Sequence, residues 1–174
     1  MIPPEEYGNT DKGCYTDFGV SGYGVAIRMS REQPMTEAMV REMAEAMMMS
    51  IAEKCMELGA RTIGHIKSHI RTECGTVRAD TIGVSHGAYS KGTLEHDVNE
   101  LFMAINSIVK GIPEPAVKAA TLEGIHEIAD KFQVLVVKEK EHSYFDEYDF
   151  LISAEEHQRQ LEEQYKDYDG EDHD

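Results

Sequence analysis

The sequence predicts an α+β fold: a ferredoxin-like βαββαβ two-layer sandwich whose second helix is split into a helix pair, followed by an acidic C-terminal extension. Three patterns predict it. An apolar stripe with helical period runs through residues 36–58, apolar and polar residues alternate over 61–86, and a short continuous apolar run occupies 133–138. We therefore expect helices on one face of a four-stranded antiparallel sheet, with its other face open.

The first half of the chain begins with a strand and a long helix. Val25, Ile27 and Met29 share one face of a strand over residues 22–30. Thr36 is the predicted N-cap of the helix, and Gly59 ends it. The stripe contains Val40, Ala44, Met47, Ile51, Cys55 and Leu58. Copper(I) binding is the alternative for the nearby methionines, but their positions favour core or interface packing.

Residues 61–86 are expected to form the central β-hairpin. Ile66 and Ile70 point to one side of the first strand, and the charged and histidine side chains between them point to the other. A turn over residues 72–75 returns the chain, and Gly75 supplies the conformational freedom that it needs. The predicted cross-strand neighbours are Arg71 with Thr76, His69 with Arg78, and Lys67 with Asp80.

The second half predicts a loop, two helices and a strand. Residues 87–92 are the loop, and a helix begins at the N-cap Thr93 and ends at Lys110-Gly111. Another helix begins at Pro113–Pro115, and residues 133–138 form an interior strand. We divide the chain into an N-terminal arm (1–21), a ferredoxin-like domain (22–139) and the acidic extension (140–174). The extension is expected to hold a short helix over 154–165 and a disordered end.

Charge and composition exclude several classes of protein. The 174 residues carry a net charge of −16, and residues 139–174 hold 14 acidic and 3 basic side chains of this total. Nucleic acid is a poor partner for such a chain, because phosphate binding needs a basic surface. No run of 18 apolar residues indicates a membrane span, and three cysteines are too few for a disulfide framework. We expect a cytoplasmic protein without a membrane partner.

The polar face of the central hairpin is the candidate ligand-binding site. Its residues are His65, Lys67, His69, Arg71, Arg78 and Asp80. The alternative is a polar sheet face that is solvated or covered by a second subunit. The candidate ligands for a divalent transition metal are His65, His69, His86 and Cys74. His65 and His69 are about 13 Å apart along one strand, so either would need ligands from elsewhere. Cys74 at the hairpin tip is a candidate ligand or redox site, with a bystander thiol as the alternative.

The order IGHIKSHI, GTVRAD and INSIVKGIPEPAVKAA, within residues 61–137, resembles the C-terminal domain of CobW-type GTPases and their small stand-alone relatives. That family is associated with metal delivery and cobalamin-related metabolism. The sequence contains no phosphate-binding loop and no thiolate metal motif, so neither GTP hydrolysis nor the metal ligands of the family carry over. The resemblance implies an accessory module.

Three functional hypotheses follow. The first is a non-catalytic accessory module that handles a metal ion or a metal-containing small ligand, or docks a partner GTPase or metalloprotein, through the open sheet face. The second is an enzyme that uses His65 or His69 as acid or base on an anionic substrate. The third is a structural module for oligomerisation. We favour the first and expect a homo-oligomer, a dimer or larger.

Overall fold

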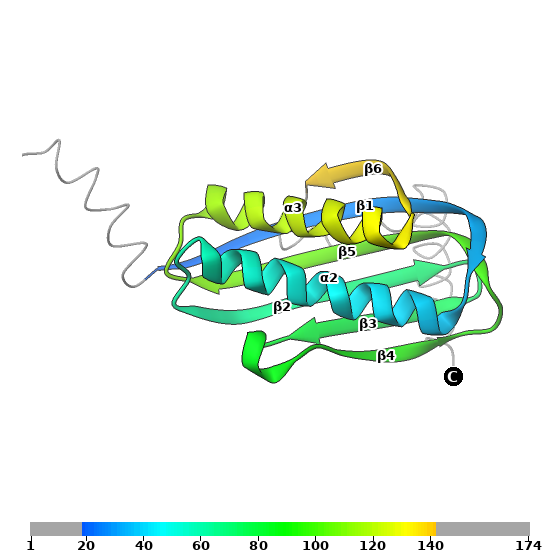
Figure 1. Ribbon diagram of the computed structural model, residues 1–174, viewed down its shortest axis with the longest axis horizontal. Coiled ribbons are helices and arrows are strands. Elements are labelled where there is room, and N and C mark those ends of the chain that lie inside the picture. The colour runs from blue at the N-terminus through cyan, green and yellow to red at the C-terminus, as the bar shows by residue number, and fades with distance from the viewer. Residues whose placement is uncertain (1–18, 142–174) are drawn as a thin grey trace, which may run out of the picture.

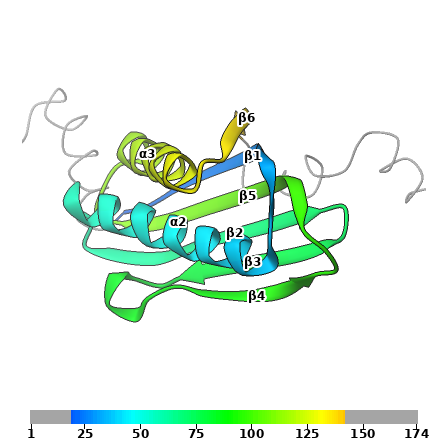
Figure 2. The same cartoon turned by 45° about the vertical axis from the view of Figure 1, so that its right-hand side comes forward.

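The computed structural model describes residues 19–141, which form a six-stranded sheet covered on one face by two helices (Figures 1 and 2). The order along the chain is β1 (Val20–Met35), α2 (Glu37–Glu57), β2 (Thr62–Thr72), β3 (Gly75–Thr81), the short 3-10 helix η1 (Val84–His86), β4 (Tyr89–Leu94), β5 (Val98–Lys110), α3 (Glu114–Phe132) and β6 (Leu135–Glu141). The strand order across the sheet is β4-β3-β2-β5-β1-β6, and every neighbouring pair is antiparallel. The α+β prediction is confirmed.

The expected first strand and helix are confirmed as β1 and α2. Val25, Ile27 and Met29 are fully buried beneath the helices. The Thr36 hydroxyl accepts a hydrogen bond from the Met39 amide at 3.2 Å, as an N-cap should. Met43, Met47 and Met48 have no exposed surface, which confirms the core interpretation for these three. Leu58 departs from the predicted stripe, because it follows the last helical turn and is 51% exposed.

The central hairpin has the predicted register. His69 lies opposite Arg78, Lys67 opposite Asp80 and Arg71 opposite Thr76. The φ of Gly75 is 154°, and a Cβ there would lie 2.1 Å from the carbonyl oxygen of Thr93 on β4. Only glycine permits this close approach. The return strand is shorter than expected, since it ends at Thr81 and a loop containing η1 follows.

The expected loop over 87–92 and the helix from Thr93 to Lys110 are wrong, since this region forms strands β4 and β5. Leu101 and Ile105 are four residues apart, as on one side of a helix, but Met103 and Val109 are buried on the same face, which is the two-residue period of a strand. β5 is a central strand between β1 and β2, and in its middle Ala104 and Asn106 are buried on the open face, so polar and apolar residues do not alternate there.

The second expected helix of the pair is confirmed as α3, and the final strand is confirmed as β6. The prediction that this strand is interior is wrong: β6 lies at the sheet edge, and Leu135 and Val137 are 66% and 50% exposed. α3 packs closely on α2, because a Cβ at Gly124 would lie 2.7 Å from Ile51 Cγ1. Neither helix is both long and apolar enough to cross a membrane.

The ferredoxin-like βαββαβ order is not matched, because two strands replace the first helix of the expected pair. β4 extends the sheet beyond β3, and β5 enters its centre. The predicted arm lies outside the described residues except for its last three, of which residues 20 and 21 begin β1. The extension, with its expected short helix and disordered end, lies outside them after Glu141.

Candidate functional site

The open face of the sheet is built by the alternation that the hairpin sequence predicts. Ile66 and Ile70 of β2 are fully buried on the helix side, whereas Lys67 between them is exposed. On β3, Val77 and Ala79 are buried and Arg78 is exposed. Since directly paired residues on neighbouring strands share a face, the predicted polar side chains gather on the side opposite the helices.

Cross-strand pairing extends this surface over all six strands. Three continuous rows can be followed through directly paired residues. One row is Lys140, Ala26, Ala104, His69, Arg78 and Lys91. The next is Lys138, Arg28, Phe102, Arg71, Thr76 and Thr93, and a third is Gly24, Asn106, Lys67, Asp80 and Tyr89. In the first row, Ala26 and Ala104 form a strip of small residues, with Lys140 on one side of it and Arg78 and Lys91 on the other.

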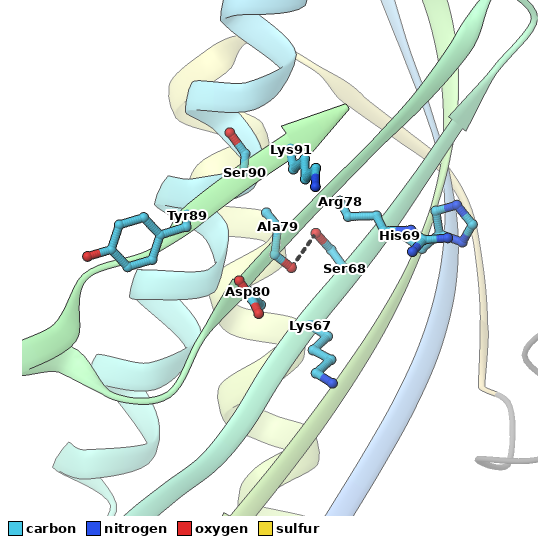
Figure 3. Close-up of a pocket in the computed structure, with 9 residues that line it drawn as sticks. All are labelled: Lys67, Ser68, His69, Arg78, Ala79, Asp80, Tyr89, Ser90 and Lys91. Atoms are coloured by element: carbon cyan, nitrogen blue, oxygen red, sulfur yellow. Dashed lines mark hydrogen bonds between the residues drawn. The ribbon is translucent and has the colours of Figure 1, made fainter. Parts of the chain in front are cut away.

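A depression of about 630 Å³ crosses the β2, β3 and β4 end of this face (Figure 3). Its lining residues are Lys67, Ser68, His69, Arg78, Ala79, Asp80, Tyr89, Ser90 and Lys91. It gathers four of the six predicted face residues. His65 and Arg71 lie on the same face of β2 and outside the lining. The volume is in the range of small-molecule sites.

Three cations of the depression are available to a ligand. Lys67, Arg78 and Lys91 come from three neighbouring strands, and none of them forms an ion pair within residues 19–141. Arg78 is the direct partner of His69, and the two side chains lie side by side in Figure 3. The strands fix the backbone positions of these three residues, and their exposed side chains are ordered when a ligand binds.

The structure divides acidic and basic side chains between its two layers. The three rows, together with the further pairs Thr62–Lys110 and Ser30–Glu100, contain eight cationic and two acidic residues. The cations are Arg28, Lys67, Arg71, Arg78, Lys91, Lys110, Lys138 and Lys140, and the acids are Asp80 and Glu100. On α2 and α3, nine acidic residues accompany four basic ones. A chain with a net charge of −16 thus presents a basic sheet face.

The pKa of His65 is lowered from its ordinary value, chiefly by burial and further by the neighbouring charge of Lys67, while Asp80 opposes the shift. His65 follows a bulge in the pairing of β2 with β5 and lies opposite Ile108. Its imidazole is therefore neutral at pH 7, and it contributes a polar group to the face without adding positive charge.

The predicted metal ligands are not brought together. His65 and His69 lie along β2, His86 is exposed in η1, and Cys74 lies at the opposite end of the hairpin. Cys74 is 9% exposed, and its Sγ donates to the His96 carbonyl oxygen at 3.2 Å. Across residues 19–141, no group of three or more His, Cys, Asp and Glu side chains is placed to hold a metal ion.

Comparison with known proteins gives distant structural neighbours. No protein-family profile matches the chain, and no curated protein matches its sequence. AtUAH in complex with glyoxylate has a TM-score of 0.43 and 10% identity, covering 71% of this chain and 27% of that one. The Zn(II)-bound GTPase YjiA from E. coli, a member of the CobW family, has a TM-score of 0.30 and 13% identity, covering 60% and 29%. The matched regions are less than a third of the length of those chains.

Sequence reasoning missed the part of the face that β4 contributes. Tyr89 and Lys91 were assigned to a loop, although the alternation in YSKGTL is the signal of a strand. Arg28 and Lys138 were placed in strands, but their membership of the same face became visible only through the pairing of β1 with β5 and β6. The face is therefore wider than the hairpin.

Proposed function

We propose that this protein is a non-catalytic module that binds an anionic ligand at the depression on its open sheet face. The observation that carries the proposal is that Lys67, Arg78 and Lys91, from three adjacent strands of an acidic protein, line one depression. The ligand class is a small molecule, or the group of a partner protein, that bears two or more phosphate or carboxylate groups.

The chemistry of the lining supports this ligand class. Guanidinium and ammonium groups donate charge-assisted hydrogen bonds to phosphate and carboxylate oxygens. Tyr89, 70% exposed, flanks the cations and supplies a flat ring, whereas the hydroxyl of Ser90 donates to Glu45 of α2 on the helix side of the sheet. Asp80 makes the site selective, because an anion must avoid this carboxylate while it contacts the neighbouring Lys67.

The resemblance of residues 61–137 to the C-terminal domain of CobW-type GTPases favours a role in metal metabolism. The proposal therefore includes a metal-containing anionic ligand, or a metal-delivery partner that docks an acidic group on this face, in the cytoplasm. The metal would arrive with the ligand or the partner. The protein would recognise charge, so no set of three converging protein ligands is required.

Isothermal titration calorimetry with pyrophosphate and with citrate tests the proposal. We expect Arg78→Gln and Lys91→Gln each to weaken binding about fivefold, since the loss of one exposed charged contact costs about 1 kcal/mol. The matched control is Lys131→Gln on α3, which removes the same charge from the helix layer. Binding of neither anion, or an equal loss in the control, would overturn the proposal.

A further inference from the structure

We propose that the acidic segment 142–174 docks on the open sheet face of its own chain and competes there with anionic ligands. The docking stands on the observations below, and the competition rests on the proposed function. The occupant is this segment, and the surface is the basic open face from β6 to β4.

The chain leaves the described structure at the edge of that face. β6 ends at Glu141, which pairs with Val25 of β1, and residues 142–174 follow directly. Neighbouring strands are about 4.8 Å apart, so the five spacings from β6 to β4 span about 24 Å. Eight extended residues cover this distance at about 3.3 Å each. The segment is long enough to cross the whole face.

The charges of the segment 142–174 and of the open sheet face are complementary. Residues 142–174 contain 12 acidic and 2 basic side chains. The paired residues of the open face include eight cations and two acids, whereas the helix layer is acidic. Attachment to β6 gives the segment an effective concentration in the millimolar range, so a weak attraction is sufficient for docking.

The middle of the face is formed by small, buried residues. Ala26 and Ala104 lie between the flanking cations and are 1% and 2% exposed, although α2 and α3 cover the opposite side of the sheet. Small residues of a sheet reach this burial under long neighbouring side chains or a covering chain. The sequence YFDEYDF at residues 144–150 combines aromatic rings, which suit a flat strip of small residues, with carboxylates for its rim.

Other occupants fit less well. A second copy that docked by the same face would place two basic surfaces against each other, which is repulsive. A nucleic acid would meet a chain with a net charge of −16. The segment from the same chain satisfies the charge of the face without either cost.

Carbodiimide cross-linking of the full chain tests the docking, because the reagent joins carboxylates to amines that are in direct contact. Peptide mass spectrometry is expected to link carboxylates of 142–174 to Lys67 and Lys91 and to leave Lys131, on the helix layer, without such links. Equal linking to Lys131 would overturn the proposal. A mixture of ¹⁵N-labelled and unlabelled protein adds a second criterion, since links of mixed label would assign the segment to a second copy and overturn docking within one chain.

Pyrophosphate titration of full-length charge variants tests the competition. The variant in the segment is Asp146→Asn with Glu147→Gln and Asp149→Asn. The control, with an equal change in net charge on the exposed side of α2, is Glu42→Gln with Glu53→Gln and Glu57→Gln. We expect the first variant to bind about threefold more tightly than wild type, the factor for a segment that occupies the face two-thirds of the time. The control should bind as wild type does.

The outcomes of the two experiments separate the docking from the anion site. Equal tightening in both variants would assign the effect to net charge and overturn the competition. Cross-links to the face without pyrophosphate binding by any variant would support the docking and overturn the proposed function. Pyrophosphate binding without links to Lys67 or Lys91 would support the anion site and overturn the docking.

Discussion

Replacing the adjacent residues Ile66 and Lys67 with alanine, one at a time, tests the alternation on which the open face depends. Ile66 has no exposed surface and lies under the helices, so Ile66→Ala removes three buried carbons and leaves a cavity. We expect a loss of about 2–5 kcal/mol in the free energy of unfolding. Lys67 is exposed on the opposite face, and Lys67→Ala should change stability by less than about 0.5 kcal/mol.

Urea unfolding followed by circular dichroism measures both variants against the wild type. Ile66→Ala should lower the midpoint and leave the slope unchanged, because the surface exposed on unfolding is nearly the same. In thermal unfolding, each 1 kcal/mol corresponds to roughly 2–4 °C for a chain of this size. Equal stability losses in the two variants, or a larger loss in Lys67→Ala, would show that β2 does not present its cations to the open side.

Three further predictions concern single residues. The pKa of His65 is lowered by burial and by Lys67, so the unfolded chain binds the proton more readily than the folded chain. Acidification from pH 7.5 to 5.5 should therefore destabilise the wild type more than His65→Gln in urea titrations. The same dependence of stability on pH in both proteins would contradict this. Burial raises the pKa of the Cys55 thiol to about 11. By mass spectrometry, iodoacetamide at pH 8 should leave this thiol unmodified in native protein and modify it in urea. Rapid labelling of the native protein would refute its burial. Gly92→Ala places a Cβ 2.1 Å from the Thr76 carbonyl oxygen at a φ of 132° and should lower the free energy of unfolding by about 1–3 kcal/mol. Gly87→Ala should cost less, because its Cβ would meet nothing within 4 Å. The reverse order in thermal unfolding would contradict the close pairing of β3 with β4.

The sequence determined the central hairpin well, because both of its strands have one buried and one exposed face. Ile66 and Ile70 mark the buried side, and the turn at Gly75 then sets the register without ambiguity. The same physics made α2 predictable, since Thr36 and Gly59 mark its two ends around a long stripe.

β5 could not be recognised in the same way. It lies between two strands, so Leu101, Met103 and Ile105 are buried against the helices while Ala104 and Asn106 are buried on the other face. A strand buried on both faces loses the polar alternation that distinguishes it from a helix. Without β5 the full width of the open face could not be predicted, because β5 joins the β2–β3 hairpin to β1 and β6.

The order of charges along β6 has a consequence for self-association. Lys138, Glu139, Lys140 and Glu141 follow one another on an edge strand. Lys118 of α3 forms an ion pair with Glu141, and the His126 imidazole contacts the Glu139 carboxylate. A strand added at this edge would have to satisfy or displace alternating charges, which is a known protection against sheet extension. At the other edge, β4 carries the single charge of Lys91 among uncharged residues. Growth of the sheet by strand addition, in a dimer or in an aggregate, would therefore begin at β4.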